Sequence, residues 1–250
     1  MFFSSSSSEK RGKEVLKNLY YFSENQMLDC NQYCIIDQET DEIALFDAGN
    51  SLSFKSLLEG MKKQNINYNN ITKVFLTHEH IDHVIGLYPL MEILKDEPPE
   101  VFAYGETAKI LSKGDTSQIC PGNLGISPSI FRVKIVPLKI NDLTNLKEIT
   151  VFSDFTFQIY YTPGHSLGSI SYYESSKKIL ISGDLVFTGG SFGRYDFPGG
   201  SLKKLQNSIK FVNDLDVKYL LPGHMGVSND GNRQIEFSLR MVLSIGSQIF

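Results

Sequence analysis

Short apolar runs separated by turn residues dominate the hydrophobic pattern of this 250-residue chain. Runs rich in Ile, Val, Tyr and Phe, with Gly, Asp or Asn nearby, predict β-strands. Eight strands are expected, over residues 32–36, 42–46, 73–77, 101–104, 155–161, 169–173, 179–182 and 219–221. The early strands form antiparallel-looking groups and the later ones alternate with helical patterns, which predicts sheets covered by helices and an α/β fold class.

Three segments between or after these strands have the spacing of amphipathic helices. Ser51 and Ser201 precede the first two and are the expected N-caps. The apolar positions are Phe54, Leu57, Leu58 and Met61 in the first segment, Leu202, Leu205, Ile209 and Val212 in the second, and Ile235, Leu239 and Val242 in the third.

The length of the chain suits one domain, so residues 1–250 are predicted to form a single unit. Residues 1–13, which include a serine run, are expected to be a flexible tail. Residues 96–149 are the least regular and contain several Pro- and Gly-based turn signals. We therefore predict an insertion or loop-rich region there.

Charge and cysteine content narrow the class of protein. The 24 Lys and Arg residues against 28 Asp and Glu give a net charge of −4, so a nucleic-acid partner is not expected, while a local basic groove stays compatible with this balance. Cys30, Cys34 and Cys120 are an odd number without a CxxC pair, which favours a reducing compartment over a disulfide framework. The sequence shows neither a signal peptide nor a membrane span. We expect a cytoplasmic protein.

Three histidines and an aspartate crowd the segment THEHIDH, residues 77–83, directly after an apolar strand. A single histidine is more often a satisfied core residue than a ligand. Clustered neutral imidazoles, however, would each need a hydrogen-bond partner and would repel one another once protonated. A divalent cation removes both problems by accepting the ring lone pairs.

The other two histidines, His165 and His224, also follow apolar runs, in the turns TPGH and LPGH. Asp184 occupies the same context after residues 179–182. Functional groups concentrate at strand ends because the sheet holds their bases still. Five histidines placed this way are hard to explain by packing, so the sequence predicts a metal site.

The pattern H-x-H-x-D-H followed by a later His, an Asp and a last His resembles the metallo-β-lactamase superfamily. All seven positions are occupied here, by His78, His80, Asp82, His83, His165, Asp184 and His224. Further matches are FDAG at 46–49 and GDLVF at 183–187. The implied fold is an αβ/βα four-layer sandwich, with the metal site at one edge of its two sheets.

The resemblance implies two sets of ligands joined by a bridging carboxylate: His78, His80 and His165 for one ion, Asp82, His83 and His224 for the other, and Asp184 between them. Two zinc ions are expected, although iron or manganese would also suit these ligands. The implied nucleophile is a hydroxide between the metals, because coordination lowers the pKa of water. Asp82 is the expected catalytic residue that orients this water, and Thr77 and Asp47 are candidates for holding the ligands in place.

The stretch GRYDFPGG, residues 193–200, resembles the branch that contains glyoxalase II-like thioester hydrolases and persulfide dioxygenases. In one interpretation Arg194 forms an internal ion pair with Asp196. In the other it faces an anionic group of the substrate, which its planar fork suits. The chain after His224 is short, so the C-terminal helical region with which glyoxalase II grips glutathione is not expected.

The predicted function is therefore metal-dependent hydrolysis of a thioester or a related small anionic acyl ester. A mononuclear iron sulfur (persulfide) dioxygenase is the first alternative, because such enzymes use the equivalents of His78, His165 and Asp184 for iron. A nuclease of the same fold and a non-enzymatic interaction module are further alternatives, the last of which would be expected to have lost ligands.

Overall fold

Two mixed β-sheets form the centre of the computed structural model, which describes residues 12–25, 28–119, 128–152 and 154–246. The first sheet has its seven strands in chain order: β1 (Gly12–Leu16), β2 (Leu19–Phe22), β3 (Gln32–Ile36), β4 (Ile43–Phe46), β5 (Ile71–Phe75), β6 (Glu100–Ala103) and β7 (Ile140–Asp142). Neighbours from β1 to β4 are antiparallel, and neighbours from β4 to β7 are parallel.

The second sheet has the order β12-β11-β10-β9-β8. Its strands are β8 (Glu148–Phe152), β9 (Phe155–Tyr161), β10 (Ile170–Glu174), β11 (Ile179–Gly183) and β12 (Tyr219–Pro222). Because β9 and β11 both run antiparallel to β10, and β12 runs parallel to β11, the carboxyl ends of β9, β11 and β12 share one edge.

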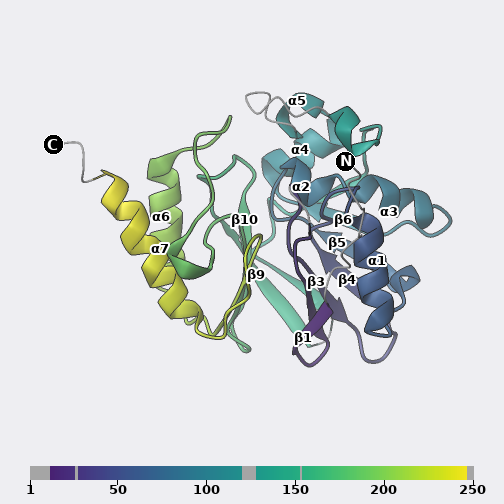
Figure 1. Ribbon diagram of the computed structural model, residues 1–250, viewed down its shortest axis with the longest axis horizontal. Helices are drawn as coiled ribbons and strands as arrows, with labels where there is room; N and C mark the ends of the chain where they lie inside the picture. Colours follow the sequence, from purple (N-terminus) through teal and green to yellow (C-terminus); the bar gives the residue numbers. More distant parts are fainter. Residues whose placement is uncertain (1–11, 26–27, 120–127, 153, 247–250) are drawn as a thin grey trace, which may run out of the picture.

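Helices cover the outer face of each sheet, so the molecule has four layers (Figure 1). The helices on the first sheet's side are α1 (Phe54–Lys63), α2 (Ile81–Val84), α3 (Leu87–Ile93), α4 (Gly105–Lys113) and α5 (Thr116–Ile119), with the 3₁₀ turns η1 (Tyr68–Asn70) and η3 (Pro128–Phe131). Those on the second sheet's side are α6 (Leu202–Asn213) and α7 (Gly231–Gly246), with η4 (Thr188–Gly190). This arrangement confirms the predicted αβ/βα sandwich.

Aromatic rings fill the space between the sheets. Phe46 of β4 lies 5.1 Å from Phe75, 5.3 Å from Phe157 and 5.3 Å from Tyr172, measured between ring centroids. All four side chains are buried. Offset and edge-to-face contacts of this kind add to the free energy of burying the rings. The first sheet supplies two of the four rings and the second sheet the other two, so this core fixes the sheets relative to each other.

All eight predicted strands exist, with bounds shifted by two residues at most. Four strands were missed: β1, β2, β7 and β8. β1 and β7 are partly exposed strands at an edge of the first sheet, and their sequences GKEVL and IND lack a continuous apolar run. Edge strands are half-solvated, so hydrophobic patterning identifies them poorly.

Of the two predicted helix caps, one is confirmed and the other is wrong. The Ser201 side chain accepts a hydrogen bond from the Lys204 N–H and caps α6, as predicted. The N-cap of α1 is Ser53, not Ser51. The Ser51 hydroxyl instead donates to the carbonyl of Phe131. The Asn50 side chain accepts from the backbone N–H of Ser53 at 2.8 Å, so an asparagine turn starts this helix.

Two predicted irregular regions are partly ordered. Residues 12 and 13, which were expected to belong to the flexible tail, begin β1, so the predicted end of the tail is corrected. Residues 1–11 and Cys120 lie outside the described residues. The stretch 96–149 contains β6, α4 and β7, so its described part completes the first sheet, while its origin as an insertion stays a prediction. Within the described ranges, no helix is both long and apolar enough to span a membrane.

Replacing a ring of the inter-sheet core tests its contribution to stability. We expect Phe46→Ala to lower the free energy of unfolding by about 3–5 kcal/mol, because the buried cavity cannot collapse between two sheets. The matched control is Phe211→Ala on α6, where the side chain is 43% exposed and the loss should stay below about 1 kcal/mol. Denaturant unfolding of both variants at equal metal loading measures the difference. Equal losses would contradict this account of the core.

Candidate metal centre

The predicted site residues lie shortly after the carboxyl ends of four strands. Both sheets contribute: His78 and His80 follow β5, His165 follows β9, Asp184 follows β11, and His224 follows β12, while Asp82 and His83 lie in α2. His80 is the N-cap residue of α2. The parallel and antiparallel pairings place these strand ends at one edge of the sandwich, and the structure brings all seven side chains together there.

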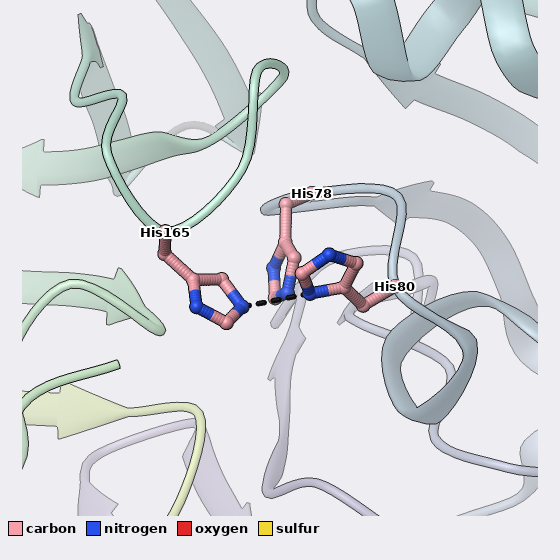
Figure 2. A group of neighbouring side chains, drawn as sticks. All are labelled: His78, His80 and His165. Carbon is pink, nitrogen blue, oxygen red and sulfur yellow. Dashed lines mark hydrogen bonds between the residues drawn. The ribbon is translucent and has the colours of Figure 1, made fainter. Parts of the chain in front are cut away.

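The first group comprises His78, His80 and His165. One ring nitrogen from each lies within 4.8 Å of the others. His80 Nδ1 and His165 Nε2 are 2.7 Å apart, and the rings of His78 and His80 leave one loop to face His165 on another (Figure 2). All three side chains are buried. Three imidazoles converging on one point form a ligand set that suits a transition metal.

The second group comprises Asp82, His83 and His224, and Asp184 lies between the two groups. The Asp184 carboxylate is 3.3 Å from His83 Nε2, 3.4 Å from His165 Nε2 and 3.3 Å from His224 Nε2. His224 Nε2 also lies 3.3 Å from Asp82 Oδ2. Asp184 therefore contacts members of both groups, which is the position that a bridging carboxylate requires.

Three buried polar atoms of this cluster have no hydrogen-bond partner among the described residues: His78 Nε2, His83 Nε2 and Asp184 Oδ1. A buried polar atom without a partner is rare and destabilising. A cation held by these lone pairs would satisfy all three. The donor set and these unpaired atoms therefore fit a divalent metal.

Burial controls the protonation of the first group. It lowers the pKa of His80 and of His165 to about 4 in each case, and neighbouring histidines add to the effect at His165. Burial, followed by repulsion from His83 and His80, likewise holds the pKa of His78 well below its usual value. These rings are therefore neutral at pH 7, which is the form that coordinates metal.

The second group combines deprotonated carboxylates with basic imidazoles. Burial acts to raise the pKa of Asp82, but His83 and His224 outweigh it and lower this pKa to about 2. The pKa of Asp184 is also held well below its usual value, against burial, by His224, His83 and His165. Around these anions the pKa of His224 is raised despite burial, chiefly by Asp184. The group thus offers two deprotonated carboxylates as ligands, and a cation bound there would displace the protons of its imidazoles.

Asp47 and Thr77, predicted to hold the ligands in place, form a buried network beneath them. Asp47 accepts hydrogen bonds from Thr77 N at 2.8 Å, Thr77 Oγ1 at 2.9 Å and His83 Nδ1 at 2.9 Å. Since the Thr77 hydroxyl hydrogen is used on Asp47, its oxygen accepts from His78 Nδ1 at 3.0 Å. Both rings therefore present Nε2 to the cluster.

Two carboxylates that support the site were missed by sequence reasoning. Glu24 accepts from His224 Nδ1 at 2.8 Å and from the Met225 N–H at 2.9 Å. Glu79, inside the THEHIDH segment, accepts from the hydroxyls of Thr107 and Ser166. A weak indication of a role for Glu79 at the site was present in the sequence, because this residue lies between the predicted ligands His78 and His80. There was no such indication for Glu24, because its hydrogen-bond partner His224 lies 200 residues away in the sequence.

Arg194 lies at the rim of a pocket whose floor includes His80, Asp82 and Asp184. Its Nε and Nη2 donate to Asp196 at 2.9 and 2.5 Å, so the predicted ion pair exists. Its backbone carbonyl accepts from His165 Nδ1 at 2.6 Å, which orients that ring. The segment after β11 thus shapes the pocket as well as the metal cluster.

Comparison of the sequence with known proteins identifies several relatives. A "Probable metallo-hydrolase" of Methanocaldococcus jannaschii is 32% identical over 200 residues, covering 78% of this chain and 86% of the relative. The hydroxyacylglutathione hydrolase GloC of Haemophilus influenzae is 32% identical, covering 56% of this chain and 61% of the relative. The human acyl-coenzyme A thioesterase MBLAC2 is 30% identical, covering 59% of this chain and 54% of the relative.

Solved structures agree with the sequence relatives. The BLEG-1 B3 metallo-β-lactamase superposes with a TM-score of 0.67 at 25% identity, covering 86% of this chain and 95% of that one. TTHA1623, crystallised in a di-iron-bound form, gives a TM-score of 0.64 at 26% identity, covering 84% and 94%. The model of the metallo-β-lactamase superfamily matches residues 27–224. The chain therefore belongs to the metallo-β-lactamase superfamily, whose fold it shares, and its His and Asp clusters could hold a divalent metal.

Proposed function

We propose that this metallo-hydrolase uses two metal ions to hydrolyse a thioester or a related small acyl ester. The observation that carries the proposal is the position of Asp184, whose carboxylate contacts His165 of one ligand group and His83 and His224 of the other. An ion held by one group alone would not need a carboxylate that also contacts the other group. Both groups are complete, and a metal-free interaction module would not need to keep them.

In this proposal His78, His80 and His165 would hold one ion, Asp82, His83 and His224 would hold the other, and Asp184 would be shared between the two groups. Two zinc ions are our first choice, with iron or manganese also compatible with these ligands. When bound, the pair of ions supplies an activated water at neutral pH and polarises the substrate carbonyl.

The chain itself contributes orientation and charge around that chemistry. Asp82 lines the pocket and is deprotonated at neutral pH, so it can accept a hydrogen bond from the attacking water and aim its lone pair at the carbonyl. Asp47 and Glu24 fix the rings of His83 and His224 through their Nδ1 atoms. Arg194 is proposed to attract the anionic part of the substrate at the rim.

Thioester hydrolysis is supported by the GRYDFPGG stretch and by two relatives, one named a hydroxyacylglutathione hydrolase and the other an acyl-coenzyme A thioesterase. Iron is supported as a second choice of metal by the di-iron form of TTHA1623. We also propose a cytoplasmic location, which suits the buried cysteines Cys30 and Cys34, neither of which forms a disulfide within the described residues.

Metal content tests the two-ion proposal directly. We expect close to two transition-metal ions per chain after expression in zinc-supplemented medium, because both ligand groups are complete. Elemental analysis of the anaerobically purified protein measures this ratio. A value of one that persists at saturating metal would exclude the two-ion site, and iron alone together with oxygen consumption on persulfides would favour the dioxygenase alternative.

Substitution of the proposed ligands separates metal binding from substrate binding. Asp184→Ala and His80→Ala should each lower kcat/KM by at least about 10²-fold, because each loss disturbs the charge that stabilises the transition state. Arg194→Ala should mainly raise KM for anionic thioesters, by about two- to fivefold, since its side chain is exposed and its charge is screened. Steady-state kinetics of the three variants decides. An unchanged KM on every anionic substrate would return Arg194 to a purely structural role.

The close packing of Gly223 against Asp184 gives a test that changes no ligand. A Cβ atom on Gly223 would lie 2.2 Å from Asp184 Oδ1, whereas one on Gly226 would have no atom within 4 Å. Gly223→Ala should therefore displace the shared carboxylate, reduce bound metal below two ions per chain and lower kcat/KM about 10-fold or more. Gly226→Ala should resemble the unmodified protein. Equal metal content in both variants, measured by elemental analysis, would argue against Asp184 as the shared ligand.

A further inference from the structure

A pocket of about 330 Å³ opens above the predicted metal cluster. This volume lies near the lower end of the range for small-molecule sites. Its polar lining consists of predicted ligands and Arg194. The other described lining residues are Gly193 and five apolar side chains: Leu28, Ile81, Phe187, Phe192 and Phe197. Away from the cluster and the rim, the surface that the pocket presents to a substrate is thus mainly apolar.

Two of the aromatic rings pack against different ligand groups of the cluster. Phe197 stands edge-on to His80, with 5.6 Å between ring centroids and an interplanar angle of 90°. Phe187 stands edge-on to His224, at 5.5 Å and 86°. The first histidine belongs to one ligand group and the second to the other. A carbonyl placed over Asp184, between the two groups, would therefore have an aromatic ring near each of them.

Arg194, which is the one Lys or Arg residue of the described lining, is directed to the rim. The Arg194 guanidinium stacks over the Phe197 ring at 4.4 Å and pairs with Asp196, and 57% of its side chain is exposed. These contacts hold the charge at the mouth, outside the aromatic walls. Arg194 can meet an anionic group in solvent, but it cannot neutralise a charge buried in the pocket.

We propose that the pocket selects an apolar acyl group, while the polar, anionic carrier of the thioester stays at the rim beside Arg194. This inference rests on the proposed thioester hydrolysis and names its substrate class. The amides and phosphates or carboxylates of a carrier would lose their hydrogen bonds to water inside these walls, and unpaired polar groups are strongly disfavoured. An alkyl chain loses nothing and gains contact with the three phenylalanines.

A series of thioesters on one carrier tests the selection. The metal-loaded full chain is assayed with N-acetylcysteamine thioesters of acetyl, butanoyl and hexanoyl groups, each corrected for its rate of hydrolysis by hydroxide. A fully buried methylene is equivalent to about fourfold in affinity. Allowing for the open mouth, we expect kcat/KM to rise at least about 20-fold from acetyl to hexanoyl.

An isosteric pair isolates polarity from size. The 2-methylpropanoyl and 2-hydroxypropanoyl (lactoyl) thioesters differ by a methyl group in place of a hydroxyl. The apolar walls should disfavour the hydroxyl, so the corrected kcat/KM of the lactoyl compound is expected to be at least about fivefold lower. An equal or higher value would overturn the proposal, because it would require a polar partner for the hydroxyl within the pocket.

Variants connect the selection to its residues. Phe197→Ala and Phe187→Ala should each reduce the hexanoyl-to-acetyl ratio of kcat/KM at least about threefold. Phe211→Ala, a matched change at a partly exposed position of α6 that does not line the pocket, should leave this ratio as it is. This ratio does not depend on the fraction of enzyme that is folded. If a variant does not fold at all, the thioester series on the unmodified protein still tests the proposal.

The outcomes separate this inference from the proposed function. A rising series that Phe197→Ala or Phe187→Ala flattens supports both. Hydrolysis of thioesters with a flat or falling series, or with a ratio unaffected by both variants, overturns the apolar pocket alone. If none of these thioesters is hydrolysed by protein with a full complement of metal, the proposed function fails and the inference fails with it.

Discussion

The buried carboxylate of Asp47 is the group on which the geometry of the site depends. It joins the end of β4 to the end of β5 through Thr77, and it fixes the ring of His83 directly and that of His78 through the Thr77 hydroxyl. Its backbone has φ of 57°, a conformation that aspartate tolerates better than most residues. One side chain in a strained turn therefore orients one histidine of each ligand group.

The two sheets must also stay in register, because each contributes part of the cluster. Hydrogen bonds cross between them at the edge that carries the site. The Ile170 N–H donates to the Thr77 carbonyl at 3.0 Å, and the Tyr33 hydroxyl donates to the Pro222 carbonyl at 2.7 Å. The Tyr172 hydroxyl reaches the Leu76 carbonyl at 2.9 Å. The aromatic core sets the separation of the sheets, and these buried bonds set the relative position of the loops.

The sequence predicted what depends on local pattern. Residues after apolar strands, such as His165 and Asp184, could be placed at a sheet edge because strand ends are visible in the hydrophobic pattern. Glu24 could not, since its role depends on a contact across the fold with His224. The start of α1 was misplaced because Ser51 and Ser53 are equally good caps in isolation, and the choice is made by the Asn50 side chain and by Phe131. Contacts of this range depend on tertiary structure, not on propensity.

The division between charged floor and apolar walls links stability to activity. His78 Nε2, His83 Nε2 and Asp184 Oδ1 are buried without a hydrogen-bond partner among the described residues, and each such atom costs about 1–3 kcal/mol of stability. The same burial gives the histidines of the first group their low pKa values and limits the access of bulk water to Asp184, which is 8% exposed. In a poorly hydrated pocket, charge developing on a substrate interacts more strongly with the cluster than it would in water. The features that weaken the folded chain on its own are therefore those that prepare it to hold cations and, in our proposal, to act on an apolar acyl group.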